Sequence, residues 1–269
     1  MSEIEAMAKL TPEERAIRDA ENLNRERGTE NETDGYECNK CLNRGYLYFA
    51  NGVYTTRREC ECWQARRTIR RMMKSGLADV IKKYTFKKYA PEDEWQKNIK
   101  AKAEAFAHDP DGKWFFIGGA SGCGKSHICT AICRALLADY PVHYMLWEDE
   151  GFRMRGLISD DPGEYQRMMN RLKNVGVLYI DDFFSGNRER KGKMRMPTEP
   201  EIRMAREILN HRYMEGKITI ISSEWYSTEI YDMDNATGGR IVEMGREYCM
   251  NVKRGPEKNY RLKMGGEML

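Results

Sequence analysis

The chain lacks any apolar run close to the ~18–20 residues that a membrane-spanning helix needs. Its first residues lack the basic flank and apolar stretch of a secretory signal, so we expect a cytoplasmic protein with no membrane contact. A strong net charge is also missing, because 45 Lys and Arg residues nearly balance 42 Asp and Glu residues. Any contact with nucleic acid must therefore come from local clusters of basic side chains. Hydrophobic residues make up 41% of the chain, which is enough for one sizeable core and excludes a fully disordered protein.

Four of the eight cysteines are clustered within 25 residues in the first part of the chain. Disulfides are not expected without a secretory signal, so these paired thiols are better read as metal ligands. The pairs have the patterns C-x2-C and C-x-C, and 18 residues separate them. Four thiolates suit a closed, tetrahedral Zn²⁺ site with a structural role, and an iron–sulfur cluster or unligated thiols are the alternatives. The predicted ligands are Cys38, Cys41, Cys60 and Cys62.

The residues between the two cysteine pairs alternate aromatic and polar side chains around Asn51-Gly52, which is a strong hairpin-turn signal. Strands are expected over Tyr46–Phe49 and Val53–Arg57. A region this short is not expected to fold without its metal.

Charged segments lie on both sides of the cysteines. A helix is predicted over Pro12–Arg27, followed by a polar linker to Asp34. A second helix is predicted over Gln64–Ser75, and it begins a basic connector with one broad face of arginines. That face is either a site for nucleic-acid phosphates or a solvated surface. Its arginines are Arg66, Arg67, Arg70 and Arg71.

From about residue 92, helices alternate with continuous apolar strands. This pattern predicts an α/β fold in which helices cover both faces of a parallel sheet. The segment Gly186–Pro197 is basic and poor in apolar residues, so we expect a mobile loop there, and Arg188–Arg195 in it are candidate contacts for DNA phosphates. Strands are expected over residues 113–118, 142–147, 177–182, 218–223 and 247–253, and helices over residues 98–107, 125–138, 164–173 and 200–215.

A phosphate-binding loop follows the first of these strands. The sequence GASGCGKS matches the P-loop motif in full, and the motif lies between a predicted strand and a predicted helix. Glycines let backbone N–H groups curl round phosphate oxygens, and the start of the helix adds a positive partial charge. Lys125 is expected to reach the β- and γ-phosphates of ATP, and Ser126 to ligate Mg²⁺. The predicted nucleotide-binding residues are Gly119, Ala120, Ser121, Gly122, Cys123, Gly124, Lys125, Ser126 and His127.

Two acidic residues end the strand that lies about 55 residues further on, in the sequence VLYIDD. With a P-loop upstream, this is the Walker B pattern, in which Asp181 holds Mg²⁺ and Asp182 orients or deprotonates the attacking water. Ser223 ends the next strand and is expected to sense the γ-phosphate or the water. Arg240, in the sequence GGRIVEM, is a candidate arginine finger, and Arg246 is its rival.

With both sites in view, residues 36–262 resemble the DnaC/DnaI-type replicative helicase loaders, which are AAA+ ATPases, and especially the phage-encoded ones. The resemblance rests on CNKC…CECW, GASGCGKS, YIDD, ISSE, GGRIVEM and NYRLK. It implies that Arg240 is the arginine finger, that Thr85-Phe86 pass the adenine, and that the helical lid is reduced or absent. Relatives often carry Asn where Glu224 stands here, which leaves the sensor role to Ser223.

The resemblance also implies partners and a domain order. The partners are a replicative DNA helicase, single-stranded DNA, and further copies of the chain through the ATPase domain. Residues 1–34 are then a helical segment with a linker, 35–75 the zinc module and basic helix, 76–103 a basic linker, and 104–269 the AAA+ domain. The alternatives are an IstB-like transposition helper, a P-loop kinase, and an adaptor in which ATP is only a switch.

Overall fold

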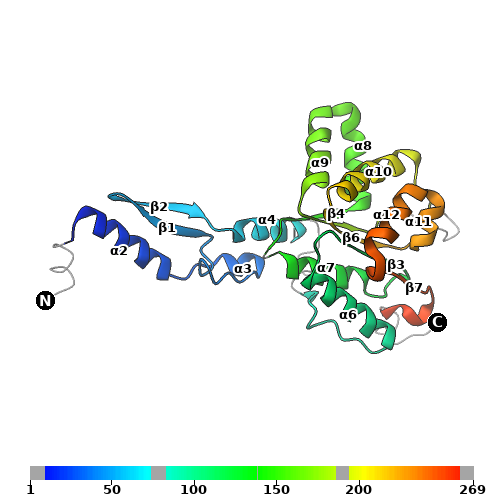
Figure 1. The fold of residues 1–269 in the computed structure, drawn as a ribbon, viewed down its shortest axis with the longest axis horizontal. Coiled ribbons are helices and arrows are strands. Elements are labelled where there is room, and N and C mark those ends of the chain that lie inside the picture. Colours follow the sequence, from blue (N-terminus) through cyan, green and yellow to red (C-terminus); the bar gives the residue numbers. More distant parts are fainter. Residues whose placement is uncertain (1–9, 74–82, 138, 186–193, 261–269) are drawn as a thin grey trace. The chain divides into compact units, whose positions relative to one another are not determined.

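The computed structural model of the chain describes residues 10–73, 83–137, 139–185 and 194–260 (Figure 1). The chain divides into two compact units, Met1–Lys74 and Ser75–Leu269. Among the described residues, no helix is both long enough and apolar enough to span a membrane.

An antiparallel hairpin forms the centre of the first unit. Its strands β1 (Tyr46–Asn51) and β2 (Tyr54–Glu59) are joined by a two-residue turn that begins at Gly52. Gly52 has a φ of 60°, the left-handed conformation that tight hairpin turns require and that glycine adopts without steric cost. The predicted hairpin is therefore confirmed, with its turn one residue later than Asn51-Gly52.

Helix α2 (Pro12–Arg25) packs against this hairpin. It begins with a capping box, in which the Thr11 hydroxyl accepts from the Glu14 amide and the Glu14 carboxylate accepts from the Thr11 amide. Near its end, Asn24 exchanges two hydrogen bonds with the backbone of Tyr48 on β1, at 2.8 and 3.0 Å. The predicted N-terminal helix is therefore present. The hydrogen bonds of the Asn24 side chain join it to strand β1, between the two cysteine pairs.

The segment expected to be a polar linker contains helix α3 (Glu30–Asp34) instead. Asp34 is fully buried and accepts a hydrogen bond of 2.6 Å from Arg66, which is also fully buried on helix α4 (Cys62–Met72). Arg70 on the same helix pairs with both Asp34 and Glu30. The expectation of a linker was wrong, because sequence composition does not show that a distant arginine neutralises Asp34.

A five-stranded parallel sheet forms the centre of the second unit, in the order β4-β5-β6-β3-β7. The predicted α/β fold with a parallel sheet is confirmed. β6 lies between the P-loop strand β3 and the acidic strand β5. The strands are β3 (Trp114–Gly119), β4 (Val142–Leu146), β5 (Val177–Asp181), β6 (Ile218–Ser223) and β7 (Cys249–Val252).

Helices cover both faces of this sheet (Figure 1). On one face lie α6 (Glu94–His108) and α7 (Lys125–Leu136). On the other, a single core joins the apolar side chains of α8, α9, α10 and α12 to those of β3, β4 and β5. The remaining elements are α8 (Trp147–Asp160), α9 (Pro162–Asn174), α10 (Glu199–Met214), α11 (Ser227–Met233), α12 (Asn235–Gly245) and two 3₁₀ turns, η2 (Arg246–Tyr248) and η3 (Pro256–Lys258).

Two further expectations need correction. Residues 94–103, assigned to the basic linker, belong to α6, which buries Ile99, Ala103 and Phe106 in the second unit. The basic segment that runs to Pro197 falls largely outside the described residues, but Arg195 is described. It forms an ion pair with the buried carboxylate of Glu201 on α10, at 2.9 Å.

Arg212 on α10 is fully buried and fixes this helix to its neighbours. Its guanidinium donates to the carbonyl oxygens of Leu172 and Val175 at the end of α9, each at 2.9 Å, and to the Thr219 hydroxyl on β6 at 3.0 Å. Burial lowers the pKa of Arg212 to about 9, so the side chain remains charged at pH 7. The negative end of the α9 dipole favours a cation at this place. The hydrogen bonds of Arg212 therefore hold α9, α10 and strand β6 of the sheet together.

Candidate functional site

The P-loop joins the end of β3 to the start of α7, as its motif predicts. Gly119 has a φ of 106°, and a Cβ there would lie 2.1 Å from the carbonyl oxygen of Val252 on β7, so no other residue fits. Gly124, with a φ of 92°, precedes the first turn of α7. The first N–H groups of a helix point away from it at its start, so the first turn of α7 and the loop form a site for anions such as phosphate.

Lys125 lies inside the loop and is buried. Its ammonium group donates hydrogen bonds to the carbonyl oxygens of Gly119, at 3.1 Å, and Ala120, at 2.8 Å. Both of these acceptors are neutral carbonyl groups. A phosphate entering the loop would supply an anionic acceptor, and charge-assisted hydrogen bonds are about twice as strong as neutral ones.

Asp181 at the end of β5 is buried and accepts hydrogen bonds from four hydroxyl groups. Its Oδ1 accepts from Tyr179 at 2.7 Å, from Ser126 at 3.3 Å and from Ser222, and its Oδ2 accepts from Tyr144 at 3.2 Å. The structure therefore brings together Ser126 and Asp181, the two residues predicted to hold Mg²⁺. A hydroxyl and a carboxylate are the oxygen ligands that Mg²⁺ prefers, so the residues present fit this ion.

Ser222 is a site residue that the sequence analysis missed. Its hydroxyl donates to Asp181 and accepts from the Asp182 amide at 3.1 Å. Ser223, the predicted sensor, donates instead to the carbonyl oxygen of Phe183 at 2.6 Å and accepts from the Trp225 amide at 3.0 Å. Because side chains alternate along a strand, a shift of one residue moves the hydroxyl to the opposite side. The hydroxyl group that contacts Asp181 is therefore that of Ser222, and that of Ser223 faces the carbonyl oxygen of Phe183.

A cavity of about 450 Å³ opens above the P-loop. Asp182 and Glu224 line it, so the predicted water-orienting carboxylate faces the same space as Lys125. Asp182 has a φ of 52°, a left-handed conformation that is uncommon outside glycine and that turns the chain sharply after β5. Residues 121–127 of the P-loop and helix α7 form the floor of the cavity.

Aromatic side chains form the wall beside His127. The ring of Tyr84 stacks on the imidazole, with centroids 4.4 Å apart and planes 9° apart, and Tyr89 meets it edge-on at 5.2 Å. Burial lowers the pKa of His127, so the ring is neutral at pH 7, and its Nε2 donates to the carbonyl oxygen of Thr85 at 3.1 Å. His127 thus lies at the cavity, Tyr84 and Tyr89 are aromatic rings that line it, and the backbone of Thr85 passes beside His127.

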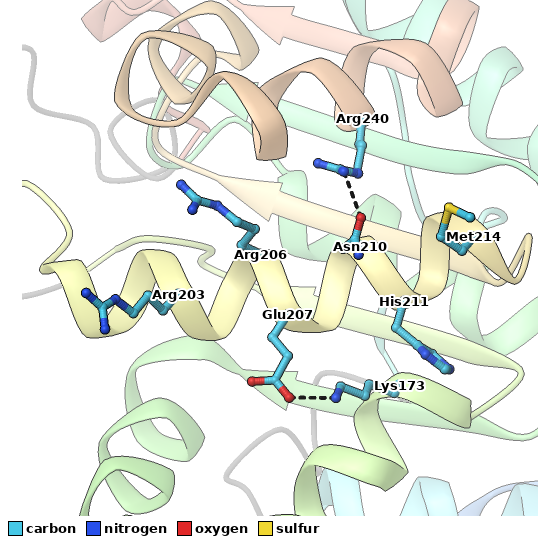
Figure 2. Close-up of a pocket in the computed structure, with 8 residues that line it drawn as sticks. All are labelled: Lys173, Arg203, Arg206, Glu207, Asn210, His211, Met214 and Arg240. Atoms are coloured by element: carbon cyan, nitrogen blue, oxygen red, sulfur yellow. Dashed lines mark hydrogen bonds and ion pairs between the residues drawn. The ribbon is translucent and has the colours of Figure 1, made fainter.

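Arg240 lies at a different surface of the same unit. It belongs to α12 and lines a second cavity, of about 640 Å³, beside α10 and α9 (Figure 2). Its guanidinium does not face the P-loop of its own chain. Its rival Arg246 is exposed at the start of η2.

The four predicted metal ligands come together in the first unit. The sulfur atoms of Cys38, Cys41, Cys60 and Cys62 all lie within 4.8 Å of one another. The Cys38–Cys60 distance is 3.9 Å and the Cys41–Cys62 distance is 3.6 Å. Four sulfurs at the usual Zn–S distance of about 2.3 Å around a tetrahedral ion are separated by about 3.8 Å. Two of the distances already match this value, so the four thiols fit Zn²⁺ with only small shifts.

Neighbouring polar groups form hydrogen bonds with the cysteines of this cluster and with each other. The Gly45 amide donates to the Cys41 sulfur at 3.3 Å, and Asn43 accepts from the Cys38 amide at 2.7 Å and from Arg66 at 3.1 Å. Such bonds orient metal ligands and neutralise part of their charge. Burial raises the pKa of Cys60, so its thiol is protonated at pH 7 without metal. Metal binding must displace such protons and weakens as the pH falls.

Comparison with known proteins identifies the fold. No family model matches the chain. Over 248 residues it is 29% identical to the phage-like element PBSX protein XkdC of Bacillus subtilis (strain 168), an alignment that covers 87% of this chain and 89% of that protein. The crystal structure of the DnaC helicase loader matches 63% of this chain and 96% of its own, with a TM-score of 0.50 and 22% identity. The crystal structure of DnaI matches 65% of this chain and 92% of its own, with a TM-score of 0.50 and 18% identity.

The second unit shares the fold of the DnaC helicase loader and of DnaI. The four-cysteine cluster precedes this fold in the chain, and a phage-element protein is similar over most of the sequence. The predicted resemblance is thereby confirmed at the level of the fold. A loader fold of this kind places Ser126, Asp181 and Asp182 at the carboxyl ends of parallel strands, where ligands bind in open α/β sheets.

The cysteine cluster makes a prediction about metal content. Protein purified without chelator should carry close to one zinc per chain by elemental analysis. Replacement of Cys60 and Cys62 by Ser should abolish zinc binding and melt the first unit, while ATP binding by the second unit survives because its sheet has its own core. Cys249→Ser, outside the cluster, is the matched control and should keep its zinc. Wild-type protein with well under one zinc per chain would contradict the four-thiolate site.

The P-loop and the acidic strand make a prediction about ATP. Lys125→Ala removes the buried cation and should weaken ATP binding by roughly ten- to a hundredfold or more. Asp182→Asn keeps the shape of the side chain but removes its charge, so it should bind ATP normally and fail to hydrolyse it. Binding is measured with a fluorescent ATP analogue, and hydrolysis by phosphate release. Equal turnover in wild type and Asp182→Asn would refute the role of Asp182.

Proposed function

We propose that the protein is an ATP-dependent loader of a replicative DNA helicase. The observation that carries the proposal is the combination of the loader fold, an assembled ATP site within it, and a separate four-thiolate unit ahead of it. In this proposal the first unit binds the helicase. The second unit binds ATP and associates with further copies of the chain, and exposed basic side chains of the chain contact single-stranded DNA.

The proposed chemistry is hydrolysis of ATP. Lys125 holds the β- and γ-phosphates, and Ser126 and Asp181 hold Mg²⁺, which neutralises the charge of the phosphates when bound. Asp182 faces the cavity and orients the attacking water. Arg240 completes the site of a neighbouring copy by stabilising the charge that develops on the γ-phosphate. Its position away from its own P-loop is consistent with action on another chain.

Contact with DNA phosphates needs arginines other than those predicted first. Arg66 is fully buried against Asp34, and Arg195 is paired with Glu201. Arg67 pairs with Glu59 at 2.8 Å, although both side chains are largely exposed. An ion pair between exposed side chains contributes little free energy, so Arg67 remains available to a phosphate. Arg66 is not available, because it is buried with Asp34. DNA binding by such exposed cations would weaken steeply with added salt.

The alternatives differ in how well the fold supports them. A P-loop kinase shares the phosphate loop but has no use for the four-thiolate unit or for an arginine acting between chains. A transposition helper shares the AAA+ core, and the identity of the partner distinguishes it from a loader.

The experiment is capture of the purified replicative helicase of the same host by the immobilised protein, with ATP and Mg²⁺ present. Wild type and Asp182→Asn should both retain the helicase. The Cys60→Ser/Cys62→Ser variant should lose it, and Cys249→Ser should keep it. If no variant captures the helicase in any nucleotide state, while a transposase–DNA complex is captured, the loader proposal is wrong and the transposition helper takes its place.

A further inference from the structure

The cavity beside Arg240 lies over one face of α10 and is bounded by α9 and α12 (Figure 2). Figure 2 shows the Arg240 side chain extending from α12 toward α10, where Asn210 meets it. The terminal nitrogen Nη2 of Arg240 donates to Oδ1 of Asn210 at 2.7 Å, and Nη1 donates to the carbonyl oxygen of Ala236, one turn earlier on α12, at 2.7 Å. The guanidinium is therefore held from two directions.

Asn210 belongs to a ladder of three contacts between α10 and α12. Arg206 donates to Asp234, the N-cap of α12, at 2.6 Å, and the Tyr213 hydroxyl donates to Glu243 at 2.9 Å. Residues 206, 210 and 213 recur at i, i+4 and i+7, so they form one stripe along α10. The ladder fixes the N-terminus, the middle and the last turn of α12.

The helix that carries this stripe is itself fixed. Arg212 on the buried side of α10 bonds to the end of α9 and to β6, as described above. Tyr213 also places its ring beneath Arg240, with the guanidinium carbon 5.4 Å from the ring centroid. Arg240 is thus set against a rigid support rather than extended into solvent.

The bonds that hold Arg240 leave it able to bind a phosphate. A guanidinium has five N–H groups, and each terminal nitrogen carries two of them. One N–H on Nη1 and one on Nη2 are used by Ala236 and Asn210, so one remains on each nitrogen. An anion can therefore be bound while both supporting bonds persist.

We propose that Asn210 is a positioning residue that orients Arg240 toward the nucleotide bound by a neighbouring copy of the chain. This inference rests on the proposed function, because it takes Arg240 to act between chains. Loss of Asn210 removes the hydrogen bond that fixes the direction of Nη2. The remaining hydrogen bond, from Nη1 to the Ala236 carbonyl oxygen, does not by itself stop the guanidinium from rotating. Small misplacements of a catalytic group cost up to about a hundredfold in rate.

The first test compares ATP binding with turnover in Asn210→Ala. The variant should bind ATP like wild type, because Asn210 is absent from the P-loop cavity, and should hydrolyse it roughly ten- to a hundredfold more slowly. Arg203→Ala is the matched control, because Arg203 lines the same cavity but pairs with Glu199 on its own helix. It should turn over ATP at the wild-type rate. Asn210→Asp keeps the acceptor oxygen and should recover most of the rate lost in Asn210→Ala.

The second test mixes variants. Asn210→Ala and Arg240→Ala both have an intact P-loop with a defective finger, whereas Lys125→Ala has the reverse. Mixing Asn210→Ala with Lys125→Ala should restore part of the activity, because some interfaces then pair a good P-loop with a well-placed Arg240. Mixing Asn210→Ala with Arg240→Ala should restore none. A purely structural defect would damage the P-loop of the same chain and would not show this asymmetry.

The outcomes distinguish failure of the positioning role of Asn210 from failure of the proposed function. If Arg240→Ala is slow but Asn210→Ala is as fast as wild type, the positioning role is wrong and the proposed function stands. If Arg240→Ala itself is as fast as wild type, Arg240 is not a finger and both the finger assignment and this inference fall. If wild type shows no turnover, the proposed function fails. The contact is then tested by a double-mutant cycle in chemical unfolding, and additive effects of Asn210→Ala and Arg240→Ala would overturn it.

Discussion

The second unit depends on one buried carboxylate. Asp181 lies at the end of a central strand, and hydroxyl groups from β4, β5, β6 and the start of α7 converge on it. A charge taken out of water is tolerated only when its hydrogen-bonding capacity is satisfied, and each bond to a charged group contributes roughly 1.5–3 kcal/mol. The same bonds fix the P-loop relative to the acidic strand before any nucleotide binds. The hydrogen bonds to Asp181 therefore contribute both to the stability of the second unit and to the preorganisation of its P-loop site.

The first unit meets a similar constraint with different chemistry. Among its described residues, three buried cysteines form a small apolar cluster, and a region of this size gains little from apolar burial alone. A metal ion bound by the four thiols would supply the missing free energy. The fully buried pair of Arg66 and Asp34 joins the helix after the cysteines to the segment before them. Removing one partner of such a pair leaves an unpaired buried charge, which costs about 3–5 kcal/mol. Both partners are therefore expected to matter for folding rather than for DNA contact.

The placement of strands, turns and clustered side chains was predicted correctly where it depends on local motifs. The P-loop, the acidic strand and the cysteine pairs are each encoded within a few residues, so strand, turn and ligand follow directly from the spacing. The failures concern partners that are distant in the sequence. No pattern near Arg66 or Arg195 indicates Asp34 or Glu201 as a partner, so these arginines looked available to phosphate. Ser223 was taken as the sensor from the resemblance, and a pair of serines at the end of a strand does not reveal which hydroxyl faces Asp181.

The contact between Asn210 and Arg240 illustrates the same limit. GGRIVEM suggests a functional arginine, but only the packing of α12 on α10 shows what holds its side chain. That α10 stripe is visible in the sequence as residues 206, 210 and 213, yet nothing in the sequence names α12 as the element that it faces.

The central claim is that ATP is hydrolysed at a site completed by a second copy of the chain. The most direct measurement is Mg²⁺-dependent phosphate release from ATP by the wild-type protein over a wide range of protein concentration, expressed per chain. The rate per chain should rise with concentration and then level off as the interfaces fill. A rate per chain that stays constant from dilute to concentrated solution, or transfer of the phosphoryl group to a small molecule instead of water, would contradict the account.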